Sequence, residues 1–166
     1  MDGTESNGRG RRPLRSPITT RGLDRAPHRA FLRGMGLSDE DIGRPFIGVV
    51  STHGEVTPCS MTLGPQAQEA KIGIRAAGGV PREFTTISVS DGLSMNHLGM
   101  RFSLVSREII ADSIEAVVRA HAYDGLVGFG GCDKTLPGVM MGIVRCNVPS
   151  VFMYGGSGLP GRWRGR

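Results

Sequence analysis

The chain of 166 residues is long enough for one domain with its own hydrophobic core, and its 26 glycines are more than twice the usual share. These glycines follow no fixed period, which excludes collagen and repeat solenoids. The net charge of +5 is concentrated in residues 1–29 and in the last five residues. The body of the chain is therefore mildly acidic and carries no basic surface for nucleic acid.

Residues 1–27 are rich in Gly, Arg, Pro and Ser and show no periodicity, so we expect a flexible, solvated lead-in before a domain over 28–166. No apolar run approaches the length of a membrane span, and the head lacks the apolar core of a secretory signal. Three widely spaced cysteines do not form a disulfide framework. These features favour a protein of the reducing cytoplasm without a membrane partner.

The first half of the chain predicts two helices and two strands. A short helix is expected over 29–37, and the apolar run at 46–50 predicts a buried strand. Helical composition over 66–77 begins after Gly64-Pro65 and ends at Gly78-Gly79. A second strand is predicted over 84–89.

The second half continues the alternation. Apolar residues three and four apart predict a long helix over 104–120, followed by a strand over 126–129. A Met-rich helix is expected over 137–146, with Asn147 as its stop, and a fourth strand over 151–154. Strands alternating with helices indicate an α/β fold with a mostly parallel sheet and right-handed crossovers.

Chemically reactive residues follow the predicted strands. Cys59, Asp91, the triplet Cys132-Asp133-Lys134 and Ser157 all lie in turns after a strand. In parallel sheets ligands bind beyond the carboxyl ends of the strands, so we expect these residues to gather at one edge.

Two cysteines are candidate ligands of a soft metal. Cys59 follows Thr57-Pro58 and is either a ligand or a small buried hydrophobic residue. Cys132 has the stronger case, because two hard ligand candidates, Asp133 and Lys134, adjoin it in a glycine-rich stretch that predicts a tight turn rather than a packed core. The two lie 73 positions apart and in no CxxC motif, so spacing alone does not indicate an iron–sulfur site. Cys146 is predicted to be a core residue.

The polar candidates have alternatives too. Asp91-Gly92 is an ordinary turn or, together with Asp133, the start of a magnesium site. Lys134 is one of two lysines among eighteen arginines; it is either an ion-paired lysine or an amine that forms a metal-binding carbamate. His97 could donate to a carboxylate or hold its own loop. The stretch 128–135 resembles a phosphate loop, but Asp133 before Lys134 would repel phosphate.

Seven strings run in family order from about Pro17 onward, and together they resemble the dihydroxy-acid and phosphogluconate dehydratase family, most closely its dihydroxy-acid branch. They are Arg25-Ala26-Pro27-His28-Arg29-Ala30, Thr57-Pro58-Cys59, Ala77-Gly78-Gly79-Val80-Pro81, Thr86-Ile87-Ser88-Val89-Ser90-Asp91-Gly92, Ser103-Leu104-Val105-Ser106-Arg107-Glu108, Gly131-Cys132-Asp133-Lys134 and Tyr154-Gly155-Gly156-Ser157.

The resemblance implies an iron–sulfur cluster, of two or four irons, held by three cysteines of which Cys59 and Cys132 match the first two. It also implies a magnesium ion bound by Asp91, Asp133 and carbamylated Lys134. The implied reaction is the removal of water from a small 2,3-dihydroxy acid to give a 2-oxo acid in branched-chain amino acid biosynthesis, by an enzyme that is a homo-oligomer when complete.

The chain also departs from the family pattern. Gly54 and Ser60 stand where asparagine is usual, and Asn96 replaces a usual glycine. The third cysteine ligand, the serine base and the second domain are expected beyond residue 166, so we expect the fragment itself to be inactive. Two alternatives stay open: a sugar-acid dehydratase of the same family, and a non-catalytic α/β binding module left by truncation.

Overall fold

The computed structural model describes residues 12–164 and contains one four-stranded, all-parallel sheet, which confirms the predicted α/β fold. The strand order across the sheet is β2-β1-β3-β4. The strands are β1 (Phe46–Ser51), β2 (Val80–Thr85), β3 (Gly125–Gly130) and β4 (Ser150–Tyr154). Since β1 and β3 form the centre, β2 and β4 are the two edge strands.

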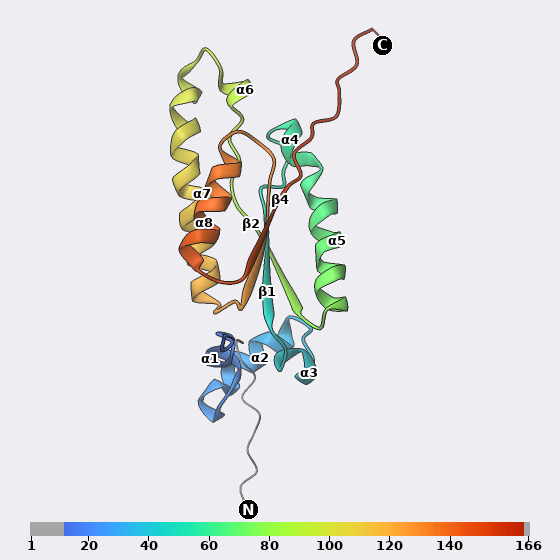
Figure 1. The fold of residues 1–166 in the computed structure, drawn as a ribbon, viewed down its shortest axis with the longest axis vertical. Helices are drawn as coiled ribbons and strands as arrows, with labels where there is room; N and C mark the ends of the chain where they lie inside the picture. Colours follow the sequence, from blue (N-terminus) through green and yellow to red (C-terminus); the bar gives the residue numbers. More distant parts are fainter. Residues whose placement is uncertain (1–11, 165–166) are drawn as a thin grey trace, which may run out of the picture.

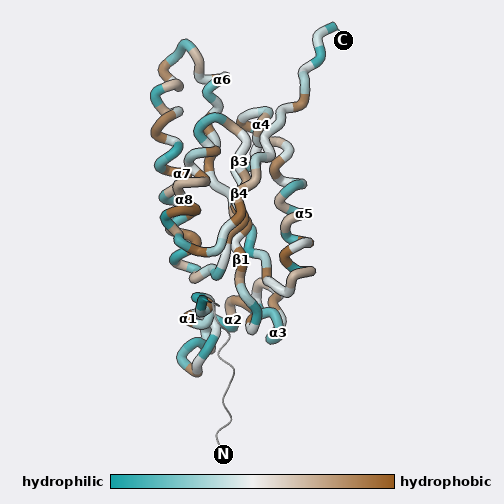
Figure 2. The backbone as a smooth tube through the Cα atoms, in the orientation of Figure 1, coloured by the Kyte–Doolittle hydropathy of each residue, from teal (hydrophilic) through white to brown (hydrophobic). Residues whose placement is uncertain are grey.

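Helices cover both faces of this sheet (Figure 1). On one face lies α5 (Leu63–Ala76), and on the other lie α7 (Arg101–Ala120) and α8 (Thr135–Cys146). Val49 and Val50 of β1 point to opposite faces because successive strand residues alternate. Val49 packs with Leu63 and Phe129, whereas Val50 belongs to the cluster of α7 and α8. In Figure 2 hydrophobic stretches of the tube lie in the middle of the sheet and on parts of the helices that flank it.

The helices α7 and α8 pack closely because α8 presents glycines to its neighbour. A Cβ atom at Gly138 would lie 2.9 Å from the Cβ of Ile110, and one at Gly142 would lie 2.9 Å from the Cβ of Ile114. The absence of side chains at these two positions lets the helix axes approach. This contact fixes the start of α8, where Lys134 stands.

Successive strands are added to the sheet in one direction from β1 to β2 and in the opposite direction from β1 to β3 and β4. From β1 the chain crosses to β2 on one side, then returns through α7 to β3 on the other side of β1. The crevice beyond the carboxyl ends of β1 and β3 is therefore a topological switch point, the place where open α/β sheets bind ligands.

The prediction for the second strand was wrong by about four residues. The strand was expected over 84–89, but β2 runs Val80–Thr85 and residues 86–90 continue without forming strand. The observed strand contains Pro81, which cannot donate a hydrogen bond to a ladder. It is tolerated here since β2 is an edge strand. The remaining strand predictions are confirmed to within one residue.

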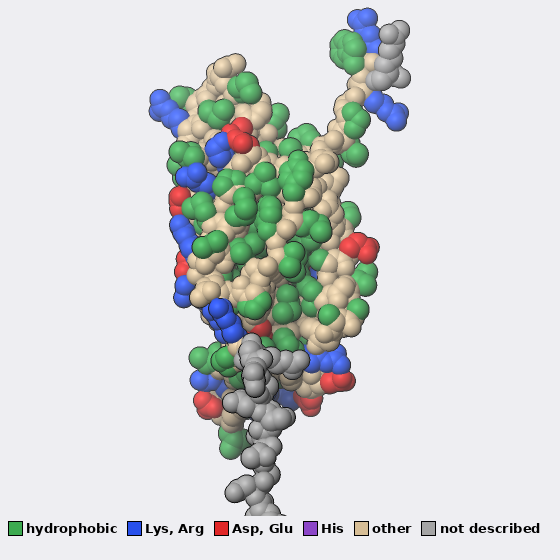
Figure 3. Space-filling model, in the orientation of Figure 1, with side chains coloured by type: hydrophobic (Ala, Val, Ile, Leu, Met, Phe, Trp, Pro, Cys, Tyr) green, Lys and Arg blue, Asp and Glu red, His purple; other side chains and the backbone are tan. Residues whose placement is uncertain are grey.

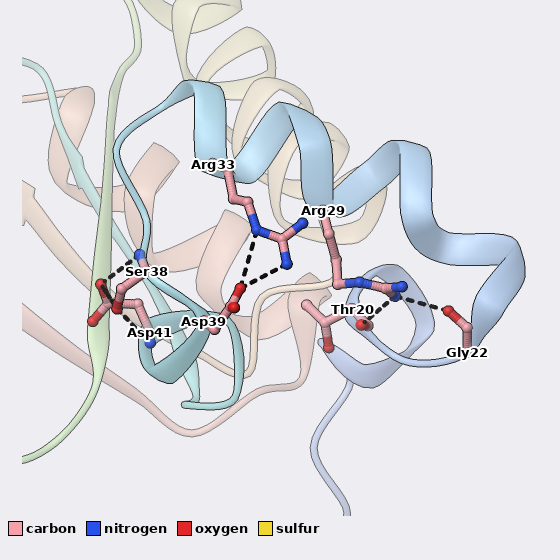
Figure 4. A network of polar contacts seen from close by, with 7 residues as sticks. All are labelled: Thr20, Gly22, Arg29, Arg33, Ser38, Asp39 and Asp41. Atoms are coloured by element: carbon pink, nitrogen blue, oxygen red, sulfur yellow. Dashed lines mark hydrogen bonds and ion pairs between the residues drawn. The ribbon is translucent and has the colours of Figure 1, made fainter.

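Short helices cover the amino ends of the strands: α1 (Pro17–Thr20), η1 (Leu23–Arg25), α2 (Ala26–Gly34) and α3 (Asp39–Ile42). The first predicted helix therefore begins three residues earlier than expected. Figure 4 shows how its arginines bind neighbouring segments. Arg29 donates to the carbonyls of Thr20 and Gly22, and Arg33 pairs with Asp39. Ser38 and Asp41 form a capping box at the start of α3.

The expected lead-in over 1–27 falls partly outside the described residues. Within the described part, residues 15–20 are attached to the sheet by Asp124, which lies just before β3. Its carboxylate accepts hydrogen bonds from the backbone N–H groups of Arg15, Ser16 and Phe46, at 2.5, 2.9 and 2.8 Å. No helix in residues 12–164 is long and apolar enough to cross a membrane.

Candidate functional site

The structure brings the predicted site residues together at the carboxyl edge of the sheet. Cys59 lies in α4 (Pro58–Met61) after β1, and Asp91 begins α6 (Asp91–Ser94) after β2. Asp133 and the two residues beside it form the turn between β3 and α8. The prediction that these turns meet is confirmed, and the two cysteines flank the switch point between β1 and β3.

Cys59 and Cys132 are neighbours although 73 positions separate them. Burial raises the pKa of the Cys132 thiol above its ordinary value, and the adjoining Cys59 thiol raises it further. Both cysteines are free thiols, and the hydroxyl of buried Thr57 lies 3.9 Å from the Cys132 sulfur. Cys132 is only 8% exposed, so the expectation of a turn outside the packed core was wrong for this side chain. The turn folds inward because its backbone is bonded internally.

Thr135 supplies those internal bonds. Its hydroxyl oxygen accepts from the N–H groups of Gly131 and Cys132, at 3.2 and 2.8 Å, and its hydroxyl donates to the Cys132 carbonyl at 2.9 Å. Thr135 is fully buried. One side chain therefore satisfies two N–H groups and one carbonyl of the turn, which helps to hold the Cys132 sulfur below the surface.

Three loops cross at the cysteine pair with no space for a methyl group. A Cβ at Gly131 would lie 2.4 Å from the carbonyl oxygen of Cys59 and 2.4 Å from the Cα of Gly156. The loop after β4 is also attached to α5, because Thr62 and Gln66 both donate to the Gly155 carbonyl, at 3.0 and 2.8 Å. The glycines therefore set how closely the turns that bear Cys59 and Cys132 approach each other.

A second cluster of polar groups adjoins this corner. The ammonium of Lys134 donates to Asp91 at 2.8 Å and also to Asp133. The hydrogen bond from Lys134, with a second one from Ser103, lowers the pKa of Asp91 from 3.8 to about 2. The same contacts, with Asp133 first, raise the pKa of Lys134. The positive charge of Lys134 therefore lies between two carboxylates.

This corner contains two kinds of candidate metal donor side by side. Neighbouring thiols suit a soft metal, whereas carboxylate oxygens suit a hard divalent ion. Within residues 12–164 no set of three or more His, Cys, Asp and Glu side chains is close enough to hold a metal ion. The described residues offer pairs of donors, and a carbamate on Lys134 would add oxygen ligands to the acidic pair.

Other predicted candidates take no part in the contacts among the cysteines, the two aspartates and Lys134. One ring nitrogen of His97 donates to the Leu93 carbonyl at 2.8 Å and the other accepts from the Gly99 N–H, so His97 holds its own loop. Ser157 is exposed beside the site. Cys146 is 1% exposed in the α7–α8 core, as predicted. Of the three departures from the family pattern, Ser60 is fully buried and donates to Ser88 at 3.3 Å.

Sequence reasoning missed the buried hydroxyls that surround the candidate ligands. Among the buried polar residues of this edge are Thr52, Thr57, Ser60, Ser103 and Thr135. The hydroxyl of Thr52 is buried and has no hydrogen-bond partner among the described residues. A possible signal was that Thr57 and Ser103 belong to strings that carry the family resemblance, yet neither residue has a charge or a known reactive group.

Comparison with known proteins shows the family of this chain. The family model described as dihydroxy-acid/6-phosphogluconate dehydratase, N-terminal, matches residues 44–165. The chain belongs to this family. Its matched region contains Cys59, Asp91 and the Cys132–Lys134 turn.

Curated relatives are similar over nearly the whole chain. Dihydroxy-acid dehydratase 3 of Bradyrhizobium diazoefficiens is 71% identical over 92% of the chain and 26% of its own length. Dihydroxy-acid dehydratase 2 of Bordetella bronchiseptica is 65% identical over 89% of the chain and 26% of its own length. Dihydroxy-acid dehydratase of Pelagibacter ubique is 57% identical over 94% of the chain and 27% of its own length. The chain therefore spans about a quarter of the length of these relatives.

Proposed function

We propose that this chain provides the amino-terminal part of a hydro-lyase that removes water from a 2,3-dihydroxy acid and forms a 2-oxo acid in branched-chain amino acid biosynthesis. The observation that carries the proposal is that a thiol pair and a carboxylate–lysine cluster share one edge of the sheet, in a chain 71% identical to a dihydroxy-acid dehydratase. Residues 28–166 would form part of the first domain of this enzyme.

The donor set fits an iron–sulfur cluster at Cys59 and Cys132 and a magnesium ion at Asp91, Asp133 and carbamylated Lys134. When bound, the two groups would supply Lewis-acid assistance to the departing 3-hydroxyl and a hold on the 2-hydroxyl and carboxylate of the substrate. The two thiols are adjacent; that of Cys132 is buried and that of Cys59 is half-buried, so the protein would partly shield iron from water. A further cysteine ligand and the serine base would come from outside these 166 residues.

The chain's own residues would orient and hold these groups. Lys134 bridges both carboxylates, so its ammonium keeps the two anions together until a divalent cation replaces the positive charge. Carbamylation requires a neutral amine, and the raised pKa of Lys134 opposes it in the metal-free chain. Metal binding and carbamate formation should therefore occur together. A divalent cation would favour loss of the ammonium proton, and the carbamate would replace the positive charge that competes with the cation.

We further propose a cytoplasmic homo-oligomer. Free thiols at the site are consistent with a reducing compartment. Exposed apolar side chains on α8 and β4 could be covered by further polypeptide, either of the same enzyme or of a second subunit (Figure 3). They include Met140, Val144, Val151, Met153 and Tyr154.

The test uses a chimaera in which this chain replaces the matching quarter of the Bradyrhizobium relative. After anaerobic reconstitution with iron, sulfide and Mg²⁺, we expect formation of 2-oxo acid from dihydroxyisovalerate. Cys59→Ala and Cys132→Ala should abolish the visible absorption of the cluster and the turnover. Cys146→Ala is the matched control, because its thiol is buried in the α7–α8 core, and it should retain both.

Two results would change the proposal. Turnover of arabinonate in preference to dihydroxyisovalerate would favour the sugar-acid dehydratase. A colourless chimaera with no turnover of either acid would favour a non-catalytic module.

A further inference from the structure

Asp91 is held by two different partners, one on each carboxylate oxygen. Ser103, in the first turn of α7, donates its hydroxyl to Oδ1, and Lys134 donates to Oδ2 at 2.8 Å. Ser103 is 3% exposed, whereas the Asp91 side chain is 19% exposed. The serine contact therefore lies on the inner side of the carboxylate, away from water.

Ser103 is itself held in place by its own helix, α7. The hydroxyl of Ser106 donates to the Ser103 carbonyl at 2.6 Å, and the same helix packs on α8 through Gly138. Asp91, in contrast, begins the four-residue helix α6, which has no residue in the hydrophobic core. The position of the Asp91 carboxylate therefore depends strongly on α7. Its side chain contacts this helix through the hydroxyl of Ser103.

We propose that Ser103 is a positioning residue for the hard divalent cation, an inference that rests on the proposed function. Its hydroxyl occupies Oδ1, so Oδ2 is the oxygen that Asp91 presents when the cation replaces the Lys134 ammonium. Partners that orient a metal ligand from behind typically change metal affinity by 10–100-fold when they are removed. Ser103 has the burial, the donor and the rigid support for this role.

The test is Mn²⁺ binding to the chimaera, followed by electron paramagnetic resonance, because Mn²⁺ takes the same hard oxygen ligands as Mg²⁺. Ser103→Ala should weaken Mn²⁺ binding by roughly 10–100-fold. Ser103→Thr keeps the hydroxyl and should restore most of the affinity. Ser106→Ala is the matched control, since it removes a buried hydroxyl of the same helix that bonds to backbone rather than to Asp91.

Each outcome is decisive. Equal Mn²⁺ affinity in Ser103→Ala and the unaltered chimaera overturns the inference, as does an equal loss in Ser103→Ala and Ser106→Ala, which would indicate a purely structural role. Mn²⁺ binding is measured before iron is added, so this result does not depend on turnover. If the unaltered chimaera does not bind Mn²⁺, the proposed metal site is wrong and the role of Ser103 is rejected with it.

Discussion

The two ends of the sheet each hold a carboxylate, and they hold it in different ways. Asp124, at the amino end, is 9% exposed and accepts three backbone N–H groups from Arg15, Ser16 and Phe46. Asp91, at the carboxyl end, is bound by the side chains of Lys134 and Ser103. Backbone donors cannot move away without unfolding, whereas a lysine side chain can change its rotamer.

This difference separates a carboxylate whose partners are fixed by the fold from one whose partners a ligand could replace. Asp124 joins the segment before α1 to the start of β1, and none of its partners could be replaced by a ligand. Asp91 keeps its charge through a partner that a divalent cation could displace. A buried carboxylate satisfied by main-chain donors therefore stabilises the fold, and one satisfied by exchangeable side chains is available for chemistry.

The largest change in the free energy of unfolding is expected from removing the carboxylate of Asp124. Asp124→Ala would leave three N–H groups without an acceptor at a buried position, which should lower the free energy of unfolding by roughly 3–5 kcal/mol. Urea denaturation followed by circular dichroism measures this. Asp112→Ala is the control: it breaks an exposed pair with Arg145 and should cost less than about 1 kcal/mol. Similar losses in the two variants would contradict a special role for Asp124.

Two glycines, one at each end of the sheet, extend the comparison between the two ends. Gly131→Ala, at the carboxyl edge, would place a methyl group 2.4 Å from backbone atoms of both Cys59 and Gly156, so the loops must separate. We expect a loss of about 1–3 kcal/mol in the free energy of unfolding, measured by thermal melting. The control is Gly34→Ala at the amino end, where a Cβ meets no atom within 4 Å. It should leave the melting temperature unchanged or raise it.

Much of the fold could be predicted from the sequence because hydrophobic periodicity reports on local burial. The strands at 46–51, 125–130 and 150–154 were found since each is an apolar run bounded by turn residues. The second strand includes Pro81, which is compatible only with an edge position, and whether a strand lies at the edge or the centre of the sheet is decided by strand order. Strand order depends on contacts between distant residues, which a single sequence does not display.

The candidate site residues could be proposed from the sequence, but the residues that hold them in place could not. Cysteine, aspartate and lysine attract attention because of their chemistry, and the alternation of strands and turns placed them at one edge. The roles of Thr135, Ser103 and Asp124 depend on three-dimensional partners, and a serine or an aspartate in a sequence carries no sign of which donor or acceptor it will meet. The stretch around Cys132 was expected to form a tight turn rather than a packed core, and the burial of its side chain was missed because the internal bonds of Thr135 were not foreseen.

The depressed pKa of Asp91 predicts a small acid-sensitive contribution to stability. A carboxylate whose pKa is lower in the folded than in the unfolded state stabilises the fold above the unfolded value of about 3.8, and this stabilisation is lost as the pH falls towards about 2. Because the side chain is partly exposed, we expect about 1–2 kcal/mol. The difference in unfolding free energy between the unaltered chain and Asp91→Asn should shrink from pH 5 to pH 2. A difference that stays constant over this range would contradict the pairing with Lys134.

The smallest effect is expected at the amino end, in the exposed pair of Arg33 and Asp39 shown in Figure 4. Half of the Arg33 side chain and 80% of that of Asp39 are exposed, so water and salt screen the attraction. Asp39→Asn should lower the free energy of unfolding by less than about 1 kcal/mol, and 0.5 M salt should remove most of that difference. The same salt should leave the cost of Asp124→Ala nearly unchanged, because its partners are backbone N–H groups and two of the three hydrogen bonds are buried. Equal salt sensitivity of the two variants would show that burial does not distinguish the two kinds of carboxylate contact.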